Sequence, residues 1–344
     1  MEEIISWLLA LIGFPTAADG DGALPCVSFL AEELSRRNVA VRRFTTDGGA
    51  RQAHHLLAVV PGERAESVLL HAHLDTAPCG RKEDWHFPAD RATRLSGFIC
   101  GRGAIDCKGP LAVWMKLLSD AAAGKRRPYT LKLLVTDLEE QGGEEGAGLL
   151  LARHPELLQG LKLVIGEGGG FPFPFGGHIF FTFQTEERES WEPRSQDASG
   201  EAPDQDQIAK TISLGIKKGY YSAELLEYAA MWDSLLGRKL DIRPLYEGMD
   251  AFFEKAADSA LYARYGPLFA SALREQVPDA CLMPCITPGT SDNRWFRKAG
   301  IPVVGFFPLA RHDPLGGIHG ADECISEASL SLAYRTLTRI LEGL

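Results

Sequence analysis

The chain has 344 residues, of which 45% are hydrophobic and 24% are charged, and its formal net charge at pH 7 is -10. This length and apolar content allow one large globular domain or two. The excess of acidic side chains argues against nucleic acid as a partner, because binding to a phosphate backbone depends on clustered Lys and Arg. No apolar run reaches the length of a membrane span, so we expect no membrane partner either.

The cysteines indicate a reducing compartment. There are seven of them, an odd number, and they are scattered without CxxC pairs, which fits free thiols better than a disulfide framework. The apolar stretch at residues 4–14 lacks the basic start and the cleavage site of a secretory leader. We therefore expect a cytoplasmic protein whose first element is a packed helix.

The apolar pattern predicts helices and strands that alternate along the chain. Helices are expected at residues 4–14, 24–34, 110–122, 146–153 and 327–341. Strands are expected at residues 40–44, 56–60, 68–71, 131–135, 161–165 and 303–307. This alternation predicts an α/β fold in which a mixed, mainly parallel sheet is covered by helices on both faces.

The composition changes in the middle of the chain, at residues 186–259. The segment SWEPRSQDASGEAPDQDQ has almost no apolar residues and predicts an acidic, flexible loop. Residues 208–217 and 223–236 then show helical spacing, and no alternating strand pattern appears. We predict one catalytic domain built from residues 1–185 plus 260–344, with residues 186–259 as a mainly helical insertion.

Acidic and histidine side chains follow the predicted strands. His73 and Asp75 lie in HAHLDTAP, Asp106 precedes a helix, and Glu139, Glu140, Glu167 and His319 each come shortly after a strand. Sites in open α/β sheets form beyond the carboxyl ends of the strands, so these groups can converge. Imidazole and carboxylate ligands suit zinc, and two such ions can activate a water molecule for attack on an amide.

Each of these residues also has a simpler interpretation. An H-x-D triplet is common by chance, Asp75 can cap a turn, and a double glutamate is usually a solvated surface. Glu167 can cap a glycine-rich turn, and His319 can be a surface histidine. Their order, their position at strand ends and their glycine-rich surroundings favour a metal centre.

Six stretches together resemble one known family. They are HAHLDTAP, GRGAIDCKGPLA, DLEEQGGEEGA, VIGEGG, PGTSDNRWFRKAGIPVVGFFP and GGIHGADECI. The sequence resembles the zinc-dependent exopeptidases and deacylases that include succinyl-diaminopimelate desuccinylase, acetylornithine deacetylase, aminoacylase and carboxypeptidase S. The resemblance covers residues 1–185 and 260–344, and it implies a zinc exopeptidase catalytic domain.

The resemblance implies a role for each matching residue. His73, Asp106 and Glu167 would hold one zinc ion, and Asp106, Glu140 and His319 the other, with Asp106 as the bridge. Glu139 would be the general base, and Asp75 would accept a hydrogen bond from His73. Thr290 and Arg294, in GTSDNRWF, would contact a substrate carboxylate, although Arg294 could equally form a local salt bridge. Cys107, beside the bridging aspartate, is not included among the ligands.

The middle of the chain departs from the family pattern. Family members carry a lid with a four-stranded sheet and a histidine that stabilises the oxyanion, and the strands and this histidine turn do not follow here. We therefore expect a reduced lid and a monomer or an oligomer built in another way. His178 lies before the lid entry and does not inherit the role.

The expected function is hydrolysis of an amide bond in a peptide or an N-acyl amino acid that bears a carboxylate. Two zinc ions are the expected cofactors, with cobalt or manganese as substitutes. The alternatives are a metal-binding scaffold without hydrolytic activity and an amide-forming biosynthetic enzyme that uses the same site. Glu139 favours hydrolysis over the scaffold, because a base beside a ligand serves no structural purpose.

Overall fold

The computed structural model describes residues 1–48, 51–124, 126–175, 178–187, 259–287 and 290–344. The predicted acidic loop and the helices at 208–217 and 223–236 lie outside these residues. The predicted division of the chain into a catalytic domain and an insertion stays a prediction for the same reason. Within the described part, no helix is both long enough and apolar enough to cross a bilayer.

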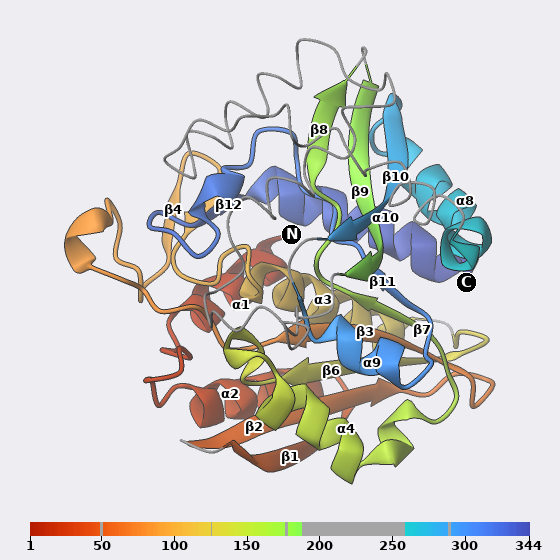
Figure 1. The fold of residues 1–344 in the computed structure, drawn as a ribbon, viewed down its shortest axis with the longest axis horizontal. Helices are drawn as coiled ribbons and strands as arrows, with labels where there is room; N and C mark the ends of the chain where they lie inside the picture. Colours follow the sequence, from red (N-terminus) through yellow and green to blue (C-terminus); the bar gives the residue numbers. More distant parts are fainter. Residues whose placement is uncertain (49–50, 125, 176–177, 188–258, 288–289) are drawn as a thin grey trace, which may run out of the picture.

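A nine-stranded sheet forms the centre of the molecule (Figure 1). Its strands run in the order β1 (Ala40–Gly48), β2 (Arg51–Val60), β6 (Thr130–Thr136), β3 (Ser67–His73), β7 (Leu161–Gly166), β11 (Val303–Gly305), β9 (His178–Glu187) and β10 (Ala280–Thr287), and β8 (Pro172–Phe175) pairs with β9. The central strands β6, β3, β7 and β11 are parallel to one another. Antiparallel pairs occur at β1–β2, β2–β6, β11–β9 and β8–β9.

Helices cover the sheet on both faces. The larger core lies against α1 (Glu2–Ile12), α2 (Ala23–Ser35), α3 (Lys108–Ala123), α8 (Ala260–Arg274) and α10 (Glu327–Gly343), and the smaller one against α4 (Leu149–Arg153) and α9 (Asn293–Lys298). Strand β3 shows why both faces need covering. Val68 and Leu70 pack into the larger core, whereas Leu69 packs into the smaller one. A strand buried on both faces has a continuous apolar run, which explains the sequence SVLL.

The predicted elements agree with the structure in their order, and several short elements were not predicted. Every helix and strand expected within the described residues is present, although α4 begins later than predicted and β11 ends at Gly305. The small sheet formed by β12 (Cys324–Ser326), β5 (Phe98–Cys100) and β4 (Thr93–Leu95) was missed. Strands of three residues are too short to show an alternating pattern. The strands β8 and β10 and the helices α8 and α9 also had no prediction.

Short turns complete the described structure. Single turns of 3-10 helix cover Lys82–Asp84, Glu139–Gln141, Pro155–Leu158 and Leu315–Gly317, and a π turn covers Glu144–Gly148. Two of them carry or precede predicted site residues. Glu139 and Glu140 open the second of these turns, and His319 follows the last 3-10 turn.

One pair of cysteines is bonded, contrary to the expectation that all of them are free thiols. Cys100 and Cys324 form a disulfide, whereas the other five cysteines are free. The physical reason is the antiparallel pairing of β5 with β12, which places these two residues directly opposite each other. They are separated by 224 residues in the sequence, so their spacing gave no indication of the pair. The cytoplasmic location stays a prediction.

Candidate metal centre

Three neighbouring parallel strands end at the same edge of the sheet and bring the predicted ligands together. His73 is the last residue of β3, and Glu167 directly follows β7. Glu139 and Glu140 lie in the turn that follows β6. Strand β3 pairs with both β6 and β7, so all four side chains start from adjacent positions on a rigid frame.

Two further predicted ligands approach this edge from loops. Asp106 lies two residues before the start of α3, and His319 lies between a 3-10 turn and β12. The Asp106 carboxylate stands between the two imidazoles. Its Oδ1 is 2.9 Å from Nε2 of His73, and its Oδ2 is 3.0 Å from Nε2 of His319. Each oxygen of one carboxylate therefore faces a different histidine.

The remaining predicted ligands complete two groups that share Asp106. In the first site, Glu167 Oε2 lies 3.2 Å from Nε2 of His73. In the second site, Glu140 Oε2 lies 3.2 Å from Nε2 of His319. We use "first site" for His73, Asp106 and Glu167, and "second site" for Asp106, Glu140 and His319.

Asp75 holds both the histidine and the glutamate pair in place. His73 Nδ1 lies 3.0 Å from the backbone carbonyl of Asp75 and 3.5 Å from its carboxylate. The carboxylate accepts hydrogen bonds from the backbone amides of Glu139 and Glu140, at 3.2 and 3.0 Å. A donor role for Nδ1 leaves Nε2 of His73 free to bind a metal ion. Asp75 thus orients three residues of the centre.

The side chains also perturb one another's ionisation. Burial opposes the charged form of His73, but the negative charge of Glu167 and the hydrogen bonds with Asp106 and Asp75 act together against it and raise the pKa of His73 well above its usual range. Hydrogen bonds to Asp106 and Glu140 raise the pKa of His319 to about 10. Burial opposes ionisation of Asp106, yet hydrogen bonds from His319 and His73 hold its pKa well below its usual value. Burial also raises the pKa of Glu139 and of Glu167.

The residues fit divalent metal ions. The ligand atoms of Asp106, Glu140 and His319 all lie within 4.8 Å of one another, and so do those of His73, Asp106, Cys107 and Glu167. Carboxylates gathered this closely repel one another unless positive charge separates them. Imidazole nitrogen and carboxylate oxygen are ligands that zinc accepts readily. The structure also brings Cys107, which the sequence analysis left out, to the first site.

Zinc binding is expected to release protons at pH 7. The raised pKa values mean that His73 and His319 are protonated in the metal-free protein, and a metal ion needs neutral imidazoles. Protons compete with the metal below the pKa, so apparent zinc affinity should rise as the pH increases toward 10. Calorimetric titration with zinc in buffers of different ionisation enthalpy would measure the protons released. Binding at pH 7 without proton release would contradict the assignment of these imidazoles as ligands.

Comparison with known proteins decides the family. The protein-family model described as Peptidase family M20/M25/M40 matches residues 69–343. The chain belongs to this family. The enzyme class predicted from the sequence, a metallopeptidase or amidohydrolase, is therefore confirmed.

Curated relatives match the chain to different extents. Aminoacylase-1A of Rattus norvegicus is 23% identical over 379 residues, which cover 92% of this chain and 89% of that protein. Cysteinylglycine-S-conjugate dipeptidase of Corynebacterium striatum is 32% identical over 105 residues, 30% of this chain and 23% of that protein. Succinyl-diaminopimelate desuccinylase 2 of Shewanella loihica is 32% identical over 129 residues, 37% of this chain and 33% of that protein. The two matches of higher identity thus span at most a third of those relatives.

Solved structures share the fold of this M20 protein. The M20 family metallo-carboxypeptidase Sso-CP2 from Sulfolobus solfataricus superposes with a TM-score of 0.67 at 15% identity, covering 99% of both chains. Human carnosine dipeptidase 1 superposes with a TM-score of 0.64 at 13% identity, covering 99% of this chain and 96% of that one. These likenesses confirm the predicted α/β fold.

The predicted substrate residues of this M20 protein lie beside the glutamate turn. The Arg294 side chain is 7% exposed, and its Nη2 binds Glu144 Oε1 at 3.0 Å and the backbone carbonyl of Gly142. Its guanidinium also stacks on Trp295. Arg294 would have to give up the Glu144 contact to reach a substrate carboxylate. Thr290 is exposed just before α9, and the substrate role of both residues stays a prediction.

Sequence reasoning missed two buried neighbours of the centre. Asn293 donates from Nδ2 to the backbone carbonyl of Glu167 at 2.9 Å, which fixes the backbone of a ligand. Asp292 accepts a hydrogen bond from Thr136 Oγ1 at 2.8 Å, and burial raises its pKa to about 8. Both lie in the GTSDNRWF stretch. Asp292 directly precedes α9 and Asn293 is its first residue, so their place in this motif was the available signal.

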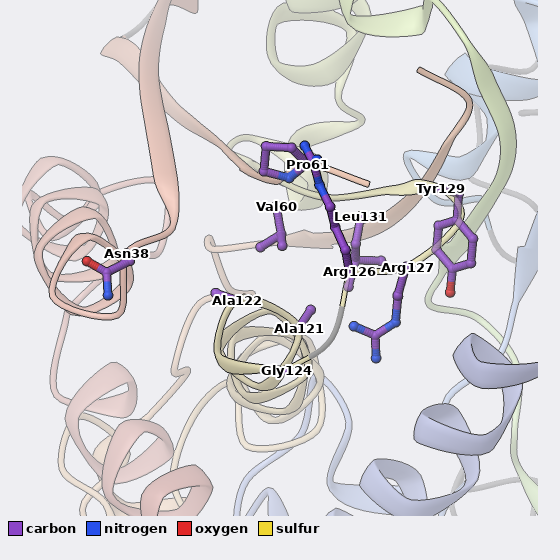
Figure 2. Close-up of a pocket in the computed structure, with 10 residues that line it drawn as sticks. All are labelled: Asn38, Val60, Pro61, Ala121, Ala122, Gly124, Arg126, Arg127, Tyr129 and Leu131. Atoms are coloured by element: carbon purple, nitrogen blue, oxygen red, sulfur yellow. The ribbon is translucent and has the colours of Figure 1, made fainter. Parts of the chain in front are cut away.

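A surface pocket lies away from the metal centre (Figure 2). Its volume is about 280 Å³, and it is lined by Val60, Ala121, Ala122, Leu131, Arg126 and Arg127, among others. Leu131 is near the start of β6, whereas the predicted ligands follow the end of that strand. None of the predicted site residues lines it. The pocket is therefore separate from the proposed chemistry.

Proposed function

We propose that the protein is a dizinc hydrolase that cleaves an amide bond in a small, carboxylate-bearing substrate, either a C-terminal peptide bond or the acyl bond of an N-acyl amino acid. One observation carries the proposal: the two oxygens of Asp106 each face a different imidazole, at 2.9 and 3.0 Å. A carboxylate placed in this way suits a bridge between two ions. Cobalt or manganese could take the place of zinc.

The chain's own residues supply the proton transfer and the orientation. Two bound zinc ions would polarise the amide carbonyl and acidify a water molecule. Glu139 is then the group that takes the proton of the attacking water and delivers it to the leaving nitrogen. Burial raises the pKa of its carboxyl group, which brings it closer to the value that suits a base working near neutral pH. The backbone amide of Glu139 is held by Asp75 at 3.2 Å.

The named activities of relatives support the substrate class. They include an aminoacylase, a desuccinylase and dipeptidases, and those names describe amide bonds in amino-acid derivatives. An acidic chain with a carboxylate-bearing substrate needs local positive charge to hold that substrate. Bound zinc ions would supply part of this charge, and Arg294, which lies beside the glutamate turn, is a candidate among the described residues.

Purified protein refilled with zinc is expected to hold two equivalents and to hydrolyse at least one class of these substrates. The reason is that five side chains form two groups of three with one shared carboxylate. Elemental analysis would give the stoichiometry, and mass spectrometry of products from panels of dipeptides and N-acyl amino acids would give the activity. Metal-free protein serves as the control. Two bound ions without any product would favour the alternative of a metal-binding scaffold.

A further inference from the structure

A buried ion pair lies beside the metal centre without contributing a ligand to it. Arg102 Nη1 donates to Glu323 Oε2 at 2.8 Å, and the two side chains are 5% and 0% exposed. Burying two charges costs desolvation energy, and such a pair often adds nothing to stability compared with apolar side chains of similar size. The contacts around this pair indicate a different contribution.

The Glu323 carboxylate binds the backbone of the loop that carries the bridging aspartate. Its Oε2 also accepts a hydrogen bond from the amide of Gly103 at 2.9 Å. Its Oε1 accepts from the amides of Ile105 and Asp106 at 2.8 and 3.0 Å. One buried carboxylate thus fixes three amides in the turn that ends at Asp106.

Arg102 connects this loop to two others. Its Nη2 donates to the carbonyl of Pro78 at 3.1 Å and to the carbonyl of Gly320 at 2.8 Å. Pro78 lies in the loop that follows His73, and Gly320 is the neighbour of His319. The planar guanidinium can bind all three acceptors at once because its donors point in fixed directions.

We infer that the Arg102–Glu323 pair is a positioning element for the second site. This inference rests on the proposed function in requiring two metal ions. Besides the shared Asp106, the first site takes His73 and Glu167 from the ends of β3 and β7, where the sheet holds the backbone. The second site takes Asp106 and His319 from loops, which have no strand ladder to hold them. Loss of the pair should therefore weaken the second site more than the first.

Arg102→Met tests the pair against a matched control, Arg94→Met. Arg94 binds Glu327 at 2.7 Å and Glu2 at 3.3 Å, and it joins β4 of the small sheet to the starts of α10 and α1. Neither of these partners lies in a loop that carries a proposed ligand. Zinc titration against a competing chelator should show the second equivalent bound roughly 10- to 100-fold more weakly in Arg102→Met, the usual effect of losing an outer-shell partner. The first equivalent should be weakened less, because Asp106 is the only one of its three proposed ligands that comes from a loop held by the pair. Arg94→Met should bind both equivalents like the wild type.

Two further variants keep the test valid if Arg102→Met does not fold. Arg102→Lys keeps the charge beside Glu323 but cannot reach both carbonyls, and Glu323→Gln keeps the shape but presents an amide to amide donors. Both should weaken the second equivalent selectively. Equal weakening of both equivalents, or behaviour like that of Arg94→Met, would overturn the inference. Failure of the proposed function would look different from failure of the inference: the wild-type protein itself would bind fewer than two ions.

Hydrogen exchange in the metal-free protein gives a reading that does not depend on zinc. The amides of Gly103, Ile105 and Asp106 are held by Glu323 in the structure. Peptides that span residues 101–107 should exchange faster in Arg102→Met and Glu323→Gln than in Arg94→Met. Unchanged exchange in both variants would show that the pair does not hold this loop.

Discussion

Glu139→Gln is expected to lower kcat by roughly 10²- to 10⁴-fold, the usual contribution of a general base, while both zinc ions stay bound. Glutamine has almost the same shape as glutamate but cannot take a proton. The hydrogen bond from the backbone amide of Glu139 to Asp75 does not involve the altered side chain, so the turn should keep its position. Kinetics on the best substrate, together with elemental analysis, would measure both quantities.

Glu140→Gln is the matched control, because it makes the same change at the adjacent residue. The Glu140 carboxylate faces His319 at 3.2 Å through one oxygen, and its other oxygen accepts a hydrogen bond from the Ala77 amide at 2.9 Å. This variant should lose affinity for one zinc ion, and its activity should recover at high zinc concentration. Glu139→Gln should not recover. If both variants lose metal equally, the two glutamates do not have separate roles.

The residues of the candidate metal centre could be proposed from the sequence because each predicted ligand is close in sequence to a predicted strand or helix. His73 and Glu167 lie at the ends of buried strands whose apolar runs are easy to recognise. Parallel strands end at the same edge of a sheet, so the order of the elements was sufficient to bring them together. The resemblance to a known family then added the pairing of ligands with ions.

Contacts between distant segments could not be proposed in the same way. Arg102 and Glu323 are 221 residues apart, and the disulfide joins residues 224 apart. Both depend on the small sheet of β4, β5 and β12, whose strands are too short to show periodicity. The sequence was also insufficient to predict where the Arg294 side chain points. Its presence in a motif suggested a substrate contact, whereas its position is determined by the turn at Gly142.

Asp106→Asn is expected to remove zinc from both sites, because each oxygen of the Asp106 carboxylate faces a different histidine. An amide has one oxygen and no negative charge, so it cannot bridge two ions. The loss of affinity should exceed the roughly 10- to 100-fold change that follows loss of an outer-shell partner. Hydrolysis should fall at least as far as in Glu139→Gln.

Asp313→Asn is the control for Asp106→Asn, because it removes another buried carboxylate without touching the centre. Asp313 Oδ2 accepts a hydrogen bond from the amide of Ser326 at 3.1 Å, and burial raises its pKa. This variant should keep two zinc ions even if its thermal stability changes. Zinc stoichiometry by elemental analysis and melting temperature by calorimetry separate the two effects. An Asp106→Asn protein that still binds two ions tightly would show that this carboxylate does not bridge them, since the amide left in its place cannot.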